Sequence, residues 1–327
     1  MGYAGRREFL AAACGLLAAT IARAQAPNAI RQIGLLWIHS PALEPWLDAL
    51  RAGLRAHGYE EGKNIRIDQG SLVNGYDELP TAAERLARAK VDVIVAYGST
   101  AVLAAHKAAP AIPVVMTIAG DPVKLGVAAS LARPGKNVTG LTSQSATAAG
   151  KRLELLREIM PSLRKCAVLL YPRSESELES LREMEEGART LKIEVHAVAI
   201  HNAAAIESAV ASIGILNVQA ITVIGSTLFS ANRERLISAV AKLNLPASYA
   251  NVAFVEAGGL AAYAPDIGAN FREAAVYVDK IFKGAMPGDL PIAQPIRWTL
   301  AINMRTAKAL GLTIPPSVLL RADRVVE

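Results

Sequence analysis

The chain has 327 residues, of which 52% are hydrophobic and only 5% aromatic, and its formal net charge is +6. Its basic residues do not form stripes interleaved with aromatic residues, so we expect no nucleic-acid partner. The length suits two domains of ordinary size. Of the two cysteines, Cys14 lies in an N-terminal apolar run and Cys166 opens a later one. Loss of the N-terminal run would leave one cysteine and no intrachain disulfide, so the fold must depend on core burial.

The N-terminus has the organisation of a secretory signal. Arg6 and Arg7 precede an apolar run from Phe9 to Ile21, and the small residues Ala22 and Ala24 follow it. This run is too short to span a membrane, and the order is that of a cleavable signal peptide. We therefore expect residues 1–24 to be a signal peptide and the mature chain to be periplasmic. The paired arginines also resemble a twin-arginine signal, which leaves the Sec and twin-arginine routes open.

Beyond the N-terminus, short apolar runs alternate with segments whose apolar residues have helical spacing. The runs expected to be buried strands are Ile33–Ile38, Val91–Ala96, Val114–Ile118, Ala167–Tyr171 and Ala220–Ile224. Leu43, Leu47, Leu50 and Leu54 are typical of the intervening helices. Strands that are apolar throughout suit a parallel sheet covered on both faces. Repeated units of this kind predict an α/β fold with doubly wound parallel sheets.

The chain has nearly twice as many alternating strand and helix segments as one such domain needs. One block runs from Ile33 to Leu141 and a second from Lys165 to Tyr249. Between them we expect a short strand and a helix over Ala148–Met160. After Asn251 we expect another strand and a helix over Phe271–Phe282.

Several segments in this order carry a family resemblance. They are Gly120–Gly126 (GDPVKLG), Arg133–Gly140 (RPGKNVTG), Lys151–Leu156 (KRLELL), Phe254–Leu260 (FVEAGGL) and Asn303–Pro316 (NMRTAKALGLTIPP). Together they resemble the ABC transporter substrate-binding protein family related to the tryptophan and tyrosine receptors. The resemblance implies the periplasmic-binding type I fold, with two Rossmann-like lobes and a three-segment hinge. It implies crossings near Leu141–Ser143, Tyr249–Asn251 and Gly284–Pro291. Lobe one would then be 28–141 plus 251–285, and lobe two 142–250 plus 286–327.

The same resemblance implies a function in solute import. The expected protein traps a small molecule between its lobes and delivers it to an ABC permease and ATPase complex at the inner membrane. A periplasmic ligand-sensing subunit of a signalling system stays open as the alternative, whereas a transcription regulator is disfavoured by the export signal and the missing helix-turn-helix. We expect a monomer.

The residue patterns of common enzymes are missing from the sequence. The five histidines are scattered without metal-ligand spacing, and there is no Gly-x-Ser-x-Gly turn and no phosphate-binding glycine loop. The first predicted strand leads into His39-Ser40-Pro41 rather than a glycine-rich dinucleotide loop. We therefore expect no catalytic residues, no metal and no cofactor.

The ligand is expected beyond the carboxyl ends of the parallel strands, where loops enter helices. In lobe one the polar residues there are His39, Ser40, Ser99, Thr100, Thr117 and Asp121. No Arg or Lys lies in these loops, so the helix start at Ser99 and Thr100 is expected to hold a ligand carboxylate through backbone N–H groups. Asp121 is a candidate for a ligand amino group. Simple helix capping is the alternative for Ser99, Thr100 and Asp121.

In lobe two the corresponding candidates are Tyr171, Ser226, Thr227, Tyr249, Asn251 and Tyr263. A tyrosine facing the cleft would stack on an apolar or aromatic ligand, whereas a core or rim position is the alternative for each. These candidates predict a carboxylate-bearing ligand, an amino acid or an aromatic acid, and leave its identity open.

Overall fold

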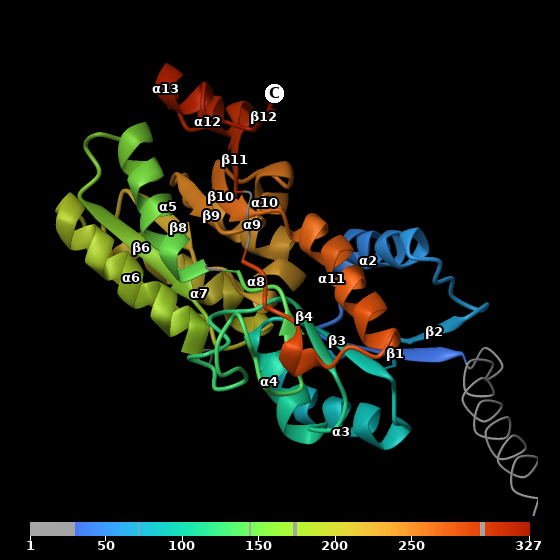
Figure 1. The fold of residues 1–327 in the computed structure, drawn as a ribbon. Helices are drawn as coiled ribbons and strands as arrows, with labels where there is room; N and C mark the ends of the chain where they lie inside the picture. Colours follow the sequence, from blue (N-terminus) through green and yellow to red (C-terminus); the bar gives the residue numbers. More distant parts are fainter. Residues whose placement is uncertain (1–29, 71, 144, 173–174, 295–297) are drawn as a thin grey trace, which may run out of the picture.

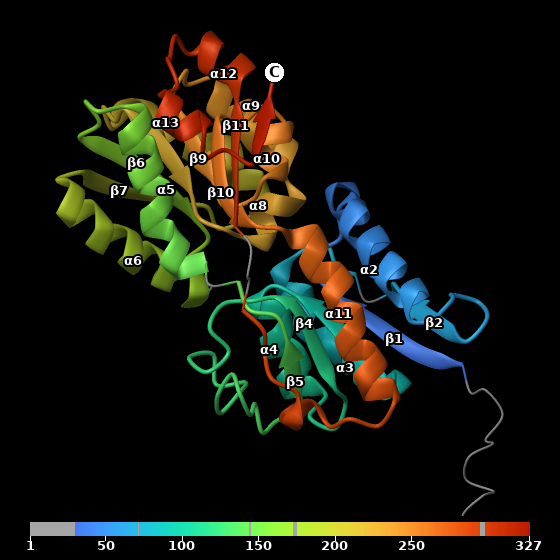
Figure 2. The ribbon, with the colours of Figure 1, turned by 45° about the horizontal axis from the view of Figure 1, so that its top comes forward.

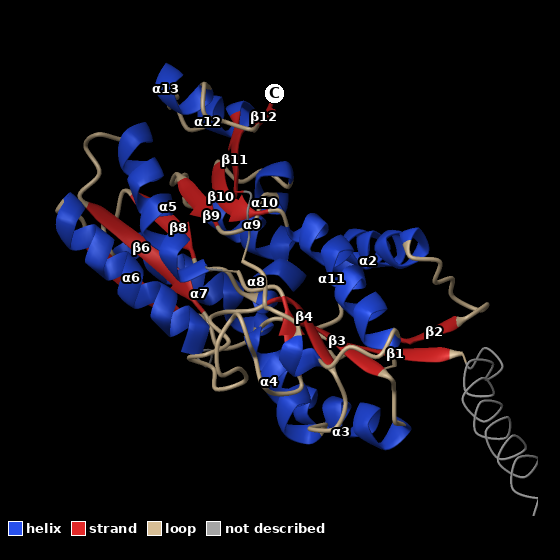
Figure 3. Cartoon of the chain, viewed as in Figure 1, coloured by secondary structure: helices blue, strands red, loops and turns tan. Residues whose placement is uncertain are grey.

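The computed structural model describes residues 30–327 except 71, 144, 173–174 and 295–297. The expected signal peptide, 1–24, lies outside the described residues. The chain forms two lobes, each built on its own sheet with helices on both faces (Figures 1 and 3). No described helix is both long and apolar enough to cross a bilayer.

The sheet of lobe one has five parallel strands in the order β2-β1-β3-β4-β5. The strands are β1 (Arg31–Leu36), β2 (Ile65–Asp68), β3 (Val93–Tyr97), β4 (Val114–Ile118) and β5 (Val138–Gly140). The helices are α2 (Glu44–Ala56), α3 (Leu79–Ala89), α4 (Ser99–Ala108) and α11 (Ile267–Phe282). Ile33 and Leu35 pack in one cluster with residues of α2 and α11, and Leu36 packs in another with residues of α3 and α4. The predicted strands β3 and β4 are therefore buried along their whole length, whereas the edge strand β2 alternates and exposes Arg66.

The sheet of lobe two has seven strands in the order β12-β11-β10-β9-β8-β6-β7. They are β6 (Lys165–Leu170), β7 (Glu194–Ala199), β8 (Ala220–Val223), β9 (Ala247–Tyr249), β10 (Ala261–Pro265), β11 (Trp298–Asn303) and β12 (Arg324–Val326). All neighbours pair in parallel except β10 with β11. The main helices are α5 (Ser145–Ile159), α6 (Glu175–Leu191), α7 (Ile206–Ser212), α8 (Thr227–Ala231), α9 (Arg233–Ala241) and α10 (Ala253–Glu256), followed by α12 (Met304–Ala309) and α13 (Pro316–Leu319) near the C-terminus.

The lobe boundaries differ from the expected ones at two points. β10 hydrogen-bonds to β9 and β11, so residues 251–265 join lobe two rather than lobe one. The chain returns to lobe one with α11, which packs along α2 (Figure 2). The second crossing is therefore at Asp266, between β10 and α11, and not at Tyr249–Asn251. The third lies after Ala293, which still bridges to Leu141, and before β11. Hence residues 286–293 lie with lobe one.

Candidate ligand site between the lobes

A cavity lies between the two lobes at the carboxyl ends of β3, β4, β8 and β9. It encloses about 770 Å³ of space outside the protein atoms, including solvent at its mouth. Its apolar lining includes Ile118, Val223, Phe229, Phe254, Ile267 and Trp298, and its polar lining includes Ser99, Thr100, Arg152, Ser176, Glu177, Ser226, Thr227, Ser230 and Asn251. An apolar hollow with a few convergent polar groups is the usual form of a small-molecule site.

Arg152 is the outstanding polar residue of this cavity. It projects from α5 and is only 1% exposed, yet its Nε and Nη2 atoms have no hydrogen-bond partner. Its Nη1 donates to the backbone oxygen of Tyr263 at 3.4 Å. Burial alone lowers the pKa of the guanidinium to about 10. A buried cation with free donors is a ready partner for an anion.

Asn251 contributes a second free donor. Its side-chain oxygen accepts a hydrogen bond from the N–H of Ala253 at 2.9 Å, which fixes the orientation of the amide at the start of α10. The Nδ2 atom of the same amide is buried and has no partner. Arg152 and Asn251 together give the cavity three buried nitrogen donors that have no hydrogen-bond acceptor.

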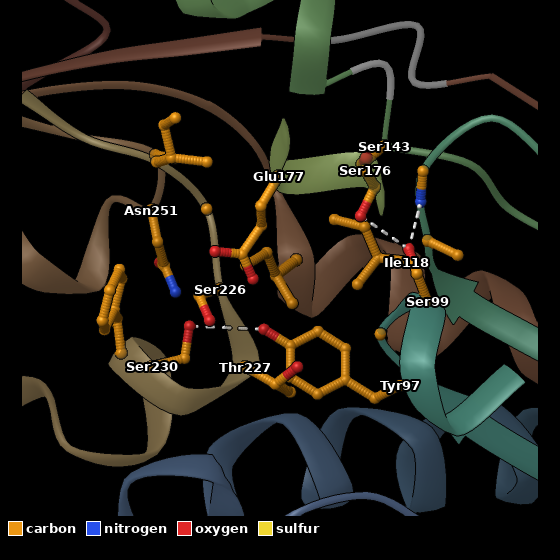
Figure 4. A pocket seen from close by; sticks show the side chains of 18 of the residues that line it. Tyr97, Ser99, Ile118, Ser143, Ser176, Glu177, Ser226, Thr227, Ser230 and Asn251 are labelled. Carbon is orange, nitrogen blue, oxygen red and sulfur yellow. Dashed lines mark hydrogen bonds between the residues drawn. The ribbon is translucent and has the colours of Figure 1, made fainter. Parts of the chain in front are cut away.

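Glu177 is the acidic group of the cavity. It lies on α6, is 4% exposed and accepts a hydrogen bond from the N–H of Tyr171 at 2.7 Å. The Ser226 hydroxyl is a second partner. Burial raises the pKa of this carboxyl well above its ordinary range, more than these hydrogen bonds lower it. Figure 4 shows Glu177 between Asn251 and the Ser99–Ser176 pair.

The two lobes contact each other directly around the cavity. The hydroxyl of Tyr76, from the short 3-10 helix Tyr76–Glu78 of lobe one, donates to Thr227 Oγ1 at 3.1 Å and accepts from the N–H of Leu228 at 3.0 Å. Tyr97 donates to Ser230 Oγ at 3.4 Å, and Ser99 and Ser176 share a hydrogen bond of 3.0 Å. Both of these bonds are drawn in Figure 4.

Glycines allow the lobes to approach this closely. A Cβ atom added at Gly120 would lie 2.4 Å from the Cβ of Ser176 in the opposite lobe. A Cβ atom at Gly98 would lie 2.6 Å from Thr227 Oγ1, and the φ of +91° at Gly98 also disfavours a side chain. At these two positions the glycine backbone of lobe one, which carries no side chain, packs directly against lobe two.

Five of the twelve predicted site residues line the cavity. They are Ser99, Thr100, Ser226, Thr227 and Asn251. Three of these hydroxyls are engaged within the protein. Ser99 Oγ accepts from the N–H of Gly120 at 2.9 Å, Ser226 Oγ caps α8, and Thr227 Oγ1 accepts from the hydroxyl of Tyr76. Arg152 and Glu177 were not among the predicted residues, and they line the cavity from the helices α5 and α6.

The lobe-one candidates that do not line the cavity have structural roles instead. Asp121 Oδ1 accepts from the N–H groups of Val123 and Lys124, so it caps a turn rather than facing the cavity. Thr117 is fully buried and its hydroxyl reaches the backbone oxygen of Ala96. His39 is exposed. The hydroxyl of Ser40 donates to the backbone oxygen of Ala231, another contact between the lobes.

The three predicted tyrosines of lobe two also lie outside the cavity lining. Tyr171 stacks on Tyr76, and Tyr249 is a core residue that stacks on Phe254 with ring centroids 4.9 Å apart. Tyr263 stacks on Trp298 and lines a second groove together with it. Aromatic character at a strand end predicts a buried ring, but not the side of the sheet on which it packs.

The chain is similar to known proteins in both sequence and structure. Residues 33–326 match the family model described as "ABC transporter substrate binding protein". The chain belongs to this family. Members are substrate-binding proteins rather than enzymes, and the two-lobed α/β architecture is the type I fold of periplasmic binding proteins.

Individual relatives agree with this assignment. A tyrosine-binding protein of Clostridioides difficile (strain R20291) is 27% identical over 280 residues, covering 84% of this chain and 79% of its own. A conserved domain protein from Vibrio cholerae superposes with a TM-score of 0.83 at 28% identity, covering 91% of this chain and 100% of its own. An ABC domain from Streptococcus pneumonia in complex with L-Trp gives the same TM-score at 24% identity, with the same coverage.

Proposed function

We propose that this chain is the extracytoplasmic solute-binding component of an ABC importer and holds a small carboxylate-bearing ligand, an amino acid or an aromatic acid, in the cavity between its lobes. The observation that carries the proposal is the buried guanidinium of Arg152 with two unpartnered nitrogens. Family membership supports the transport role. The tyrosine-binding relative and the structure with L-Trp support the ligand class.

The buried guanidinium of Arg152 favours a carboxylate ligand for an energetic reason. Removing a guanidinium from water costs several kcal/mol, and only a well-placed anion or hydrogen-bond acceptor offsets that cost. Arg152 has one bond of 3.4 Å to a neutral carbonyl. A carboxylate accepts two parallel hydrogen bonds from a guanidinium and matches the free Nε and Nη2 atoms in number. The free amide of Asn251 offers a further donor to the same kind of ligand.

The apolar lining suits the remainder of such a ligand. Ile118 of lobe one faces a cavity whose other walls include Phe229, Phe254 and Trp298 of lobe two. Aromatic rings bury large areas and pack well on planar or aliphatic side chains. Because both lobes supply lining residues, the ligand contacts the full set only when the lobes are closed, and it favours closure by that difference in affinity.

Thermal-shift and calorimetric titrations of the mature protein with L-amino acids and aromatic acids test this proposal. The Arg152→Met variant should bind the selected ligand at least about 100-fold more weakly, because one partner of a buried charge pair is removed. Lys151→Met is the matched control, since it removes a positive charge from the adjacent, exposed position of α5. Equal affinity of Arg152→Met and wild type would contradict the site.

Export and transport have their own readouts. Mass spectrometry of the periplasmic protein should find an N-terminus at Gln25, and a full-length cytoplasmic product would contradict export. Uptake of the ligand by cells that carry this chain with its permease and ATPase should require Arg152. Ligand-dependent signalling without uptake would favour the sensing alternative.

A further inference from the structure

Glu177 is a second buried charge-bearing group in the cavity and lies on the inner face of α6. On that face Ser180, Met184 and Ala188 follow it at helical spacing, and all of them are buried. The other members of this row are uncharged. Glu177 lines the cavity, so a ligand held there would lie next to it.

The surroundings of Glu177 offer hydrogen bonds but no counter-charge. The Tyr171 N–H and the Ser226 hydroxyl bond to it, and Glu177 forms no ion pair with any described residue. The phenol of Tyr76 from lobe one lies close enough to interact with the charge of Glu177, and the guanidinium of Arg152 lines the same cavity.

The nearby charges are engaged elsewhere. On α6 itself, Glu175 pairs with Arg182, and Glu179 pairs with Lys124 of lobe one. Arg152 and Glu177 form no ion pair among the described residues, and the Nε and Nη2 atoms of Arg152 have no hydrogen-bond partner. The carboxyl of Glu177 is thus left to a partner that enters the cavity.

A carboxylate accepts about four hydrogen bonds, so two partners leave room for an ammonium group. In the empty cavity the raised pKa means that the carboxyl keeps a proton at a pH where an exposed glutamate has lost it. A cation beside it would reverse that preference, because opposite charge favours the ionised form.

We infer that Glu177 is the cation subsite of the cavity: it binds the protonated amine of the ligand and releases its own proton to solvent as the ligand binds. The exchange balances, since a neutral carboxyl and an ammonium become a carboxylate–ammonium pair and one solvated proton. This inference rests on the proposed carboxylate site at Arg152. It narrows the ligand from carboxylic acids in general to those that also carry an amine.

Matched ligand pairs test the inference on the mature protein. L-Tyrosine is compared with 3-(4-hydroxyphenyl)propionate, and L-tryptophan with indole-3-propionate, each pair differing only in the amine. Wild type should prefer the amino acid by roughly 30-fold or more, the usual consequence of losing one partner of a buried charge pair. Glu177→Gln should lose this preference and bind the acid as well as wild type does. Glu175→Gln, an exposed position of the same helix, should behave as wild type.

Calorimetry of the amino acid at pH 6 in buffers of different ionisation enthalpy counts the released protons. Wild type should release a measurable fraction of one proton, and Glu177→Gln should release none. Wild-type binding of the acid as tightly as the amino acid, or proton release unchanged in Glu177→Gln, would overturn the inference while leaving the carboxylate site intact. Failure of every amino acid and aromatic acid to bind would instead overturn the proposed function, and this inference with it.

Discussion

The phenol ring of Tyr76 lies almost parallel to that of Tyr171, with ring centroids 4.4 Å apart, although the two residues belong to different lobes. Beyond the stacked rings, the Tyr76 hydroxyl reaches the start of α8. There it forms hydrogen bonds with Thr227 and with the N–H of Leu228. The closed arrangement is therefore held in part by the protein itself. A ligand adds to this closure rather than creating it.

Tyr76→Phe should weaken closure without removing the stack. The variant loses the hydroxyl and its bonds across the lobes, which we expect to cost about 1–2 kcal/mol of closure free energy. Small-angle scattering should show a larger radius of gyration for the unliganded variant than for wild type. Tyr59→Phe, whose hydroxyl bonds to Asp279 within lobe one, is the control and should leave the radius unchanged. An unchanged radius in Tyr76→Phe would mean that other contacts suffice to close the lobes.

Arg152→Met should stabilise the empty protein even though it abolishes binding. Replacing a buried, poorly partnered charge by an apolar side chain of similar length is often stabilising, here by about 1–3 kcal/mol. Urea denaturation without ligand should therefore give a higher free energy of unfolding than wild type. A lower value would show that the bond from Arg152 to the Tyr263 oxygen contributes more than the desolvation of the guanidinium costs.

Glu177→Gln should change how stability depends on pH. The pKa of Glu177 is raised in the folded state, so the folded protein binds more protons than the unfolded chain above the ordinary value of 4.5. The free energy of unfolding of wild type therefore falls, through this group, as pH rises from 4.5 towards the raised pKa. The stability of Glu177→Gln relative to wild type should increase over that window, by up to about 1.4 kcal/mol per pH unit. Denaturation at pH 5 and pH 8 measures it, and a difference that does not vary with pH would contradict the raised pKa.

Gly120→Ala should act as a wedge between the lobes. The added methyl group would lie 2.4 Å from the Cβ of Ser176, so the lobes must separate or shift to admit it. We expect about 1–3 kcal/mol of lost ligand affinity, the range for overpacking, together with a larger radius of gyration. Gly150→Ala, where no atom lies within 4 Å of the added carbon, is the control. Wild-type affinity in Gly120→Ala would show that the contact is not needed in the bound state.

Much of the fold could be predicted because buried parallel strands are apolar on both faces. The predicted run Val114–Ile118 is β4 without change, and Ala220–Ile224 differs from β8 by one residue. β10 was assigned to the wrong lobe because its sequence carries no information on its neighbours. Pairing with β9 and β11 is a long-range property, set when the chain folds back from β11.

The site residues were harder to predict, because the burial of a charged side chain also depends on how the chain folds. Polar residues at strand ends reach the cavity at Ser99 and Asn251, since strand ends converge at one edge of the sheet. Arg152 and Glu177 instead lie within helices, where a charged residue is usually taken as solvent-facing. The available signal was their helical phase: Arg152 stands three residues after Ala149 and four before Leu156, on the apolar side of α5. A charge in an apolar stripe is a better indicator of a buried site than polarity in a loop.

Trp298 lines the cavity between the lobes and also the second groove, next to Tyr263. The other two tryptophans of the chain, Trp37 and Trp46, belong to the core of lobe one. A ligand that enters the cavity changes the solvent around one indole and leaves the other two in their packed surroundings. The unlabelled protein thus carries its own optical reporter: Trp298 emission should respond to cavity occupancy, and a Trp298→Phe variant would give the constant background to subtract.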